Sequence, residues 1–301
     1  MTVARRNRPE HPVHLGLKLS QGAPIEAFRE VWRIADEAGF DHCWAFDHLV
    51  ALDSEGSPRL LFEGWSLVCA MAVATTRTRI GLLVGGMAYR HPALLAKIAV
   101  TADHLSAGRL EFGIGAGWAE RERSTYGIDD SHPVGRFKEG LDVLELLWSG
   151  ERASYEGKHF RLKDAIAAPR PVQKPRPPLW IGAGGPRMLR LTAERADVWN
   201  PAVEGFEAAL KAGDQLHRLC DAVGRDPASI RWSTQVPFDG RDPAAAIAEL
   251  EQWREAGFSE LVVYCSGRDP VAAATVAAER ILPVVRGRRS RAAEVQSERL
   301  P

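Results

Sequence analysis

The chain has 301 residues, of which 45% are hydrophobic and 26% are charged, and its 39 basic side chains balance its 39 acidic ones. These proportions are typical of a folded globular protein and exclude a disordered chain. Zero net charge gives no electrostatic case for a nucleic-acid partner, and no window approaches the ~20 consecutive apolar residues of a membrane span.

Residues 1–12 are predicted to be a flexible N-terminal tail, because they are basic and no apolar signal-peptide core follows them. From residue 13 to residue 287, short apolar runs alternate with longer amphipathic ones. We expect strands at 14–19, 42–46, 79–85, 110–116, 179–183, 197–200, 230–236 and 260–264. Residues 288–301 are polar and are predicted to be a flexible C-terminal tail.

Helical patterns follow the predicted strands, for example at 26–38, 94–105 and 247–256. This alternation favours an α/β fold, a single (β/α)8 TIM barrel, over an open doubly wound sheet, because no linker divides the chain. Residues 151–178 are rich in proline and charge, and interrupt the alternation after the fourth helix. An insertion of that length is typical of a lid, a binding loop or an excursion with its own hairpin.

In such a barrel, chemistry takes place at the carboxyl ends of the strands. Asp47 and His48 follow the second predicted strand and suit proton transfer or hydrogen bonding to a heterocycle. Alternatively, Asp47 caps a turn and His48 packs passively. The four cysteines are widely spaced, which is typical of reduced thiols in the cytoplasm.

Glycines mark the next strand ends. Gly85 and Gly86 follow Val84 and allow a backbone to approach a flat ligand. After the fourth strand come Gly115, Ala116, Gly117 and Trp118, which lack the full dinucleotide-binding spacing. We interpret this run as close packing at the barrel mouth, with Trp118 lining a pocket; the alternative is that Trp118 is a core aromatic residue.

The fifth strand leads into a glycine-rich turn and a helix. The residues of this turn are Gly182, Ala183, Gly184, Gly185, Pro186 and Arg187. Free backbone amides at a helix N-terminus bind phosphate, and Arg187 adds a positive charge; the alternative is an ordinary glycine-rich turn between a strand and a helix. No His, Cys or Asp spacing indicates a metal site, and Lys18 is the one lysine at a predicted strand end, a weak candidate for a Schiff base.

Four segments of the chain resemble the luciferase-like monooxygenase superfamily, especially its branch that uses the deazaflavin coenzyme F420. They are FDHCWAFDH (40–48), YRHPALLAK (89–97), LSAGRLEFGIGAGW (105–118) and WIGAGGP (180–186). The third is the most specific. The resemblance implies a barrel that binds a reduced flavin or deazaflavin at its mouth.

The resemblance also implies roles for individual residues. A cis peptide bond between Leu83 and Val84 supports one face of the ring, and residues 115–118 flank the cofactor. The phosphate site matches residues 182–187. Asp47 is expected to contact the polar edge of the cofactor, and His48 to handle the proton.

The resemblance therefore predicts an F420-dependent oxidoreductase that moves a hydride between the deazaflavin and a small organic substrate. Trp118 and Leu52 differ from the pattern of the sugar-phosphate dehydrogenases of this branch, which disfavours that substrate. One alternative is an FMN-dependent monooxygenase served by a separate reductase. Another is a cofactor-binding protein with little turnover, because the sequence secures no strong acid beside His48. By analogy we expect a homodimer.

Overall fold

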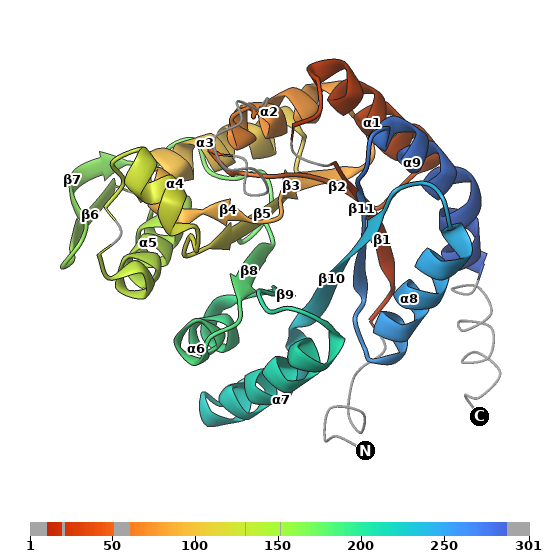
Figure 1. Cartoon of the computed structure of the whole chain (residues 1–301). Helices are drawn as coiled ribbons and strands as arrows, with labels where there is room; N and C mark the ends of the chain where they lie inside the picture. Colours follow the sequence, from red (N-terminus) through yellow and green to blue (C-terminus); the bar gives the residue numbers. More distant parts are fainter. Residues whose placement is uncertain (1–10, 20–21, 51–60, 130, 151, 288–301) are drawn as a thin grey trace, which may run out of the picture.

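The computed structural model in Figure 1 describes residues 11–19, 22–50, 61–129, 131–150 and 152–287. In this part of the chain, eight parallel strands form a closed barrel with helices around it, which confirms the predicted fold class. The barrel strands are β1 (His14–Leu19), β2 (His42–Ala45), β3 (Arg79–Leu82) with its continuation β4 (Gly85–Gly86), β5 (Leu110–Gly115), β8 (Leu179–Ala183), β9 (Val198–Pro201), β10 (Arg231–Phe238) and β11 (Glu260–Cys265). Almost all of both predicted tails lies outside the described residues.

Pairing runs in the order β3-β2-β1-β11-β10-β9-β8-β5, and β3 pairs with β5 to close the barrel. One predicted strand, at 79–85, is interrupted. β3 ends at Leu82, and pairing resumes in β4, where Gly85 lies opposite Ile114. Leu83 and Val84 form a bulge between the two pieces, and the peptide bond between them is cis.

The helices begin earlier than the apolar periodicity predicts, because proline occupies the first turn of several of them, where its missing N–H costs nothing. The helices are α1 (Ile25–Ala38), α2 (Gly64–Ala74), α3 (Pro92–Leu105), α4 (Glu120–Thr125), α5 (Pro133–Trp148), α6 (Pro186–Arg195), α7 (Phe206–Ala222), α8 (Pro243–Glu255) and α9 (Pro270–Val276). Short helical turns lie at η2 (Met87–Tyr89), η3 (Pro227–Ser229) and η4 (Ala277–Ile281).

Two separate apolar clusters stabilise the barrel. The larger one fills the layer between strands and helices and includes Leu15, Leu17 and Leu19 of β1. The smaller one consists of Trp44, Leu83, Trp180, Val198 and Val262, with Val84 packed against it. Its members come from strands on different sides of the barrel and yet touch one another, so they fill the barrel interior. The barrel is therefore a packed core with its chemistry confined to the ends.

The segment at 151–178 contains a hairpin, in which β6 (Arg152–Glu156) pairs with β7 (Arg161–Ile166) in antiparallel register. Exposed residues alternate with more buried ones along β6, and β7 breaks this alternation at Lys163 and Asp164, which are both exposed. In Figure 1 the hairpin lies at one edge of the molecule, beside α5.

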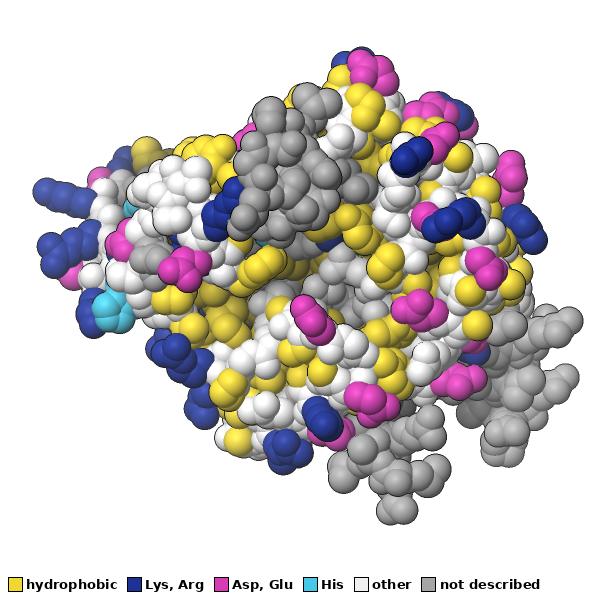
Figure 2. Space-filling model, in the orientation of Figure 1, with side chains coloured by type: hydrophobic (Ala, Val, Ile, Leu, Met, Phe, Trp, Pro, Cys, Tyr) yellow, Lys and Arg dark blue, Asp and Glu magenta, His cyan; other side chains and the backbone are white. Residues whose placement is uncertain are grey.

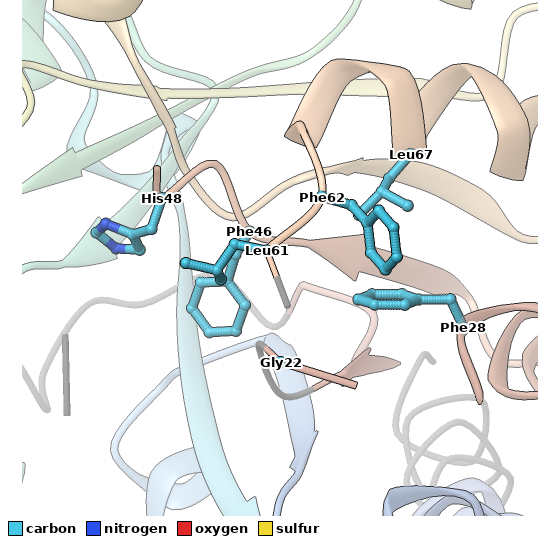
Figure 3. A pocket seen from close by; sticks show the side chains of 7 residues that line it. All are labelled: Gly22, Phe28, Phe46, His48, Leu61, Phe62 and Leu67. Atoms are coloured by element: carbon cyan, nitrogen blue, oxygen red, sulfur yellow. The ribbon is translucent and has the colours of Figure 1, made fainter. Parts of the chain in front are cut away.

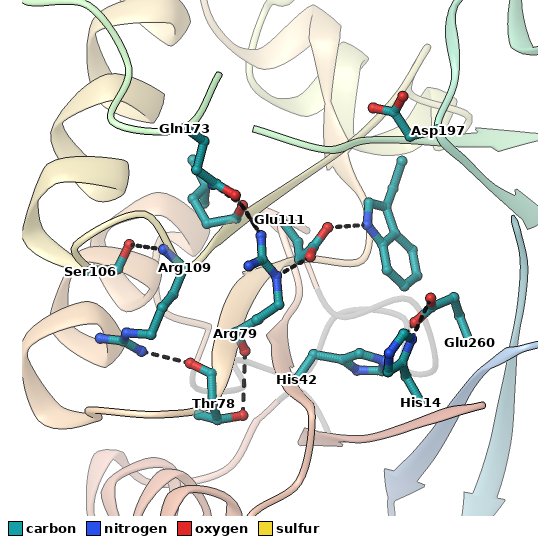
Figure 4. A network of polar contacts seen from close by, with 12 residues as sticks. His14, His42, Thr78, Arg79, Ser106, Arg109, Glu111, Gln173, Asp197 and Glu260 are labelled. Carbon is teal, nitrogen blue, oxygen red and sulfur yellow. Dashed lines mark hydrogen bonds and ion pairs between the residues drawn. The ribbon is translucent and has the colours of Figure 1, made fainter. Parts of the chain in front are cut away.

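A buried ionic network closes the amino-terminal end of the barrel (Figure 4). Glu260, at the start of β11, accepts hydrogen bonds from His14 Nδ1 at 2.9 Å and His42 Nε2 at 3.1 Å, and it pairs with Arg231. Burial raises the pKa of Glu260, but these partners outweigh burial and hold the pKa well below its ordinary value. The network joins barrel strands that are far apart in the sequence, and we call it the base network.

Glu260 is therefore expected to make the fold sensitive to acid. Because its pKa is lowered in the folded state, it stabilises the fold above the unfolded value near 4.5, and this contribution is lost as the pH falls below that value. Glu260→Gln is expected to cost about 3 kcal/mol at pH 7 and to show less further loss on acidification. Urea unfolding between pH 7 and pH 3.5 measures both effects, with Glu207→Gln on the exposed face of α7 as the control. Equal pH dependence in wild type and Glu260→Gln would refute the assignment.

Candidate functional site

The carboxyl ends of the parallel strands meet at the opposite end of the barrel, and most of the predicted site residues lie there. Val84, in the bulge after β3, lies against two glycines of this rim. A Cβ added at Gly182 would lie 2.7 Å from Val84 Cγ2, and one added at Gly115 would lie 3.2 Å from the same atom. Gly182 leaves no room for a side chain, and Gly115 leaves little, because Val84 packs directly on the backbone of β5 and β8. The structure thus brings three of the predicted cofactor-binding residues together.

A buried lysine fixes the bulge from below. Lys18 Nζ donates to the carbonyl oxygen of Leu83 and to Gln235 Oε1, both at 2.6 Å, and lies 3.4 Å from the centre of the Phe46 ring. Burial lowers the pKa of Lys18 well below its ordinary value. The side chain is not available to a substrate carbonyl, so the structure gives Lys18 a positioning role in place of the Schiff-base role that the strand-end location allowed.

Asp47 lies just under the rim and is 2% exposed. Its two carboxylate oxygens accept hydrogen bonds from the guanidinium of Arg90, both at 2.7 Å, and Oδ2 also accepts one from the Gly86 amide at 3.0 Å. Burial raises the pKa of Asp47, and the contacts with Arg90 and Gly86 oppose that change. Asp47 therefore holds the segment after the bulge in place. Contact between Asp47 and a cofactor edge stays a prediction.

His48 has a buried acid beside it that the sequence does not reveal. Glu122 of α4 is completely buried, and its Oε2 accepts a hydrogen bond from His48 Nδ1 at 2.9 Å and another from the Tyr89 hydroxyl. Its Oε1 accepts from the amides of Leu49 and Val50, the latter at 3.1 Å. The expectation that no acid is secured beside His48 is wrong.

The local charge pattern conceals Glu122. Residues 120–123 alternate acid and base, and only the fold determines that Glu120 faces solvent while Glu122 faces His48. Burial raises the pKa of Glu122, but the hydrogen bonds from His48 and Tyr89 outweigh burial, so its pKa is lowered and it is ionised at neutral pH. An ionised acceptor keeps the imidazole proton on Nδ1 and leaves Nε2 free to exchange a proton.

Apolar side chains lie beside His48. Figure 3 shows a small cavity lined by Gly22, Phe28, Phe46, His48, Leu61, Phe62 and Leu67. The Trp118 ring packs edge-on to the His48 ring with centroids 5.9 Å apart, and Trp118 is 74% exposed. Trp118 is thus at the mouth and is not a core residue, so the alternative interpretation of it is wrong.

The turn before α6 has the geometry of an anion site. Gly185 is the N-cap of α6, and no side chain forms a capping hydrogen bond there. Within the described ranges, the amides of Gly184, Gly185 and Arg187 donate to no other protein group. A Cβ at Gly185 would meet no atom within 4 Å, so the space in front of these amides is open. The residues present therefore fit the phosphate that FMN and F420 both carry.

No helix among the described residues has the length and hydrophobicity that a membrane span requires. No three of their His, Cys, Asp and Glu side chains are grouped so that they could bind a metal ion.

Two known proteins are similar to this chain in sequence. A ketoreductase of phthiodiolone and phenolphthiodiolone dimycocerosates from Mycobacterium tuberculosis (strain ATCC 25618 / H37Rv) is 34% identical over 230 residues, which are 69% of this chain and 59% of the relative. The chain thus spans less than two thirds of that protein. An F420-dependent glucose-6-phosphate dehydrogenase from Amycolatopsis mediterranei (strain U-32) is 27% identical over 84% of this chain and 92% of its own.

A solved structure agrees on the fold. An F420-dependent secondary alcohol dehydrogenase, in complex with an F420-acetone adduct, superposes with a TM-score of 0.77 at 20% identity, covering 91% of this chain and 99% of that one. The sequence profile of one family, described as luciferase-like monooxygenase, matches residues 11–298, nearly the whole chain. The protein is therefore an enzyme of the luciferase-like monooxygenase family, as the four sequence segments predict.

Proposed function

We propose that this enzyme transfers a hydride between C5 of coenzyme F420 and a small organic carbonyl or alcohol with an apolar substituent. The observation that carries the proposal is His48, whose proton is fixed by Glu122 and whose ring packs against the exposed Trp118 ring at the barrel mouth. The Amycolatopsis relative, named for its dependence on F420, supports this cofactor over FMN. The Mycobacterium relative, named a ketoreductase, supports a carbonyl substrate.

Different residues of the rim would bind the cofactor and transfer the proton. The amides before α6 would hold the cofactor phosphate, and Val84 would offer an apolar surface to a flat ring. When bound, F420 supplies a hydride donor or acceptor at C5. His48 Nε2 would give a proton to the substrate oxygen or take one from it, while Glu122 stabilises the protonated imidazole. Trp118, which packs against the His48 ring and is exposed at the mouth, would contact the apolar part of the substrate and keep water away from it.

Cofactor titration tests the proposal. Purified protein is titrated separately with F420 and with FMN while cofactor fluorescence is followed. Turnover is then measured from the absorbance of oxidised F420 with secondary alcohols of increasing chain length, and in reverse with ketones. We expect F420 to bind more tightly and to turn over. Tight binding of FMN alone, with oxygen consumption in the presence of a flavin reductase, would point instead to the monooxygenase function.

Gly185→Asp tests the phosphate site separately from the fold. Asp is a favourable N-cap, so stability should rise or stay within a few tenths of a kcal/mol. The new carboxylate would lie where the phosphate binds, and like charges ~4 Å apart repel by about 1–4 kcal/mol, so F420 affinity should fall at least about tenfold. Gly185→Asn is the control, because it caps the helix without the charge. Equal affinities of the two variants would show that no phosphate binds there.

A further inference from the structure

A second feature of the molecule lies next to the predicted phosphate-binding turn at residues 182–187. A hollow of ≈ 460 Å³ opens between the start of α5, the start of α6 and the turn of the β6–β7 hairpin. We call it the hairpin annex. Its lining residues are His132, Pro133, Gly135, Lys138, Glu139, Asp142, Tyr155, Lys158, His159 and Arg187. Arg187 lies in the first turn of α6, so the annex continues from the predicted phosphate site.

The lysine and arginine side chains of the annex form no ion pair among the described residues. Within the described ranges, the charged atoms of Lys138, Lys158 and Arg187 form no ion pair or hydrogen bond with another protein group. The rings of His132 and His159 lie beside each other, tilted by 38° at a centroid distance of 5.6 Å. Three cationic side chains and two histidines therefore line one hollow. Figure 2 shows Lys, Arg and His side chains along the edge that α5 and the hairpin occupy in Figure 1.

The two acidic residues of the annex are already engaged. Glu139 accepts hydrogen bonds from the backbone amides of Lys158, His159 and Phe160 at 2.8–3.1 Å, and so fixes the turn of the hairpin. Asp142 pairs with Arg195 at 2.8 Å and accepts a hydrogen bond from the Tyr155 hydroxyl at 3.4 Å. Neither carboxylate forms an ion pair with Lys138, Lys158 or Arg187, and the three cations exceed the two carboxylates, so the lining has a net positive charge.

The helix ends add to this potential. α5 and α6 both begin at the annex, each with a proline in its first turn and without a capping side chain. Their N-terminal dipoles carry a partial positive charge toward the same space. A positive field from unpaired side chains and from two helix ends favours a ligand with several negative charges.

We infer that the hairpin annex binds the carboxylates that a deazaflavin cofactor carries beyond its phosphate. The inference rests on the proposed function. F420 continues past its phosphate into a chain of carboxylates, whereas FMN ends at the phosphate. The annex begins where a phosphate at α6 would end, and its charge matches such a chain. It therefore gives the enzyme a means of selecting F420 over FMN at a distance from the ring.

Charge removal at the annex tests the inference. The double variant Lys138→Gln/Lys158→Gln changes two exposed side chains, so the fold should be retained. F420 affinity is expected to fall about three- to tenfold, and its dependence on salt should weaken. Affinity for FMN, and for the deazaflavin nucleoside that lacks both phosphate and carboxylates, should stay unchanged. Lys163→Gln/Lys211→Gln removes the same charge at exposed positions elsewhere and is the control.

Two further measurements separate the possible failures. Free γ-linked triglutamate should bind wild type weakly by calorimetry and should not bind the Lys138→Gln/Lys158→Gln variant; binding to both equally, or F420 affinity that the variant leaves unchanged, would overturn the inference. The proposed function would survive that result, provided that Gly185→Asp still weakens F420 binding. If wild type binds no F420 at all, the proposed function itself fails. An equal loss of FMN and F420 affinity in the lysine variant would make the annex part of the phosphate site and also overturn the inference.

Discussion

Glu122→Gln is expected to lower kcat by about 10²- to 10⁴-fold, the usual contribution of a positioned proton-transfer group. The amide that replaces the carboxylate does not stabilise a protonated His48, and it does not favour the His48 tautomer with its proton on Nδ1. The amide oxygen still accepts from the amides of Leu49 and Val50, so the loop after His48 should stay in place. The loss should therefore fall on kcat, with little change in cofactor affinity.

The chain offers a matched control for this prediction. Glu120→Gln removes the same charge two residues earlier in α4, where the side chain is exposed. His48→Ala and the double variant His48→Ala/Glu122→Gln complete a cycle, and because the two groups act as one unit, the double loss should be close to the larger single loss. Independent, multiplying losses would contradict the pairing. Wild-type activity in Glu122→Gln would remove Glu122 from the mechanism altogether.

Arg90→Met is expected to lower the free energy of unfolding by about 3–5 kcal/mol, because it leaves the buried Asp47 carboxylate without its cation. Among the described residues, the Gly86 amide would then be the remaining hydrogen-bond donor to that carboxylate. Burial already raises the pKa of Asp47, and the variant should raise it further. A raised pKa in the folded state means that stability is lost as the pH rises above the ordinary value of 3.8, so the deficit should be larger at pH 7 than at pH 5.

Urea unfolding at the two pH values measures this effect. Asp47→Asn/Arg90→Met should recover much of the stability, because it removes the uncompensated charge along with its partner. Arg218→Met, at an exposed position on α7, is the control for the loss of a guanidinium. A deficit in Arg90→Met no larger than that control, or one that grows on acidification, is incompatible with a buried ion pair at Asp47.

Sequence patterns predict the barrel because its strands are nearly continuous apolar runs, and a run such as 179–183 has no other stable place than a strand covered on both faces. The glycines at 115 and 182 are readable as close-contact positions for a similar reason. What they contact is not readable, since Val84 reaches them only through a bulge that interrupts β3. The predicted single strand at 79–85 missed that interruption because hydrophobicity continues across it.

Side-chain partners were harder to predict than strands. Asp47 and Arg90 are 43 residues apart, and their pairing depends on the closure of the barrel. Asp47 stands next to His48 in sequence, which suggested a shared chemical role, but the structure directs the two side chains to different partners. The burial of Glu122 is not predictable from the sequence, because α4 is short and charged and no apolar periodicity shows which of its faces is buried.

The base network has a consequence for how this molecule can be altered. Its ion pairs join β1, β2, β10 and β11 at their starting residues, a full strand length away from His48 and the α6 turn. Loops can therefore be grafted onto the catalytic end, or exchanged between paralogues, without disturbing the contacts that anchor the scaffold. Because the stabilising network and the catalytic end are separate, substrate specificity can diverge while the amino-terminal end of the barrel stays unchanged.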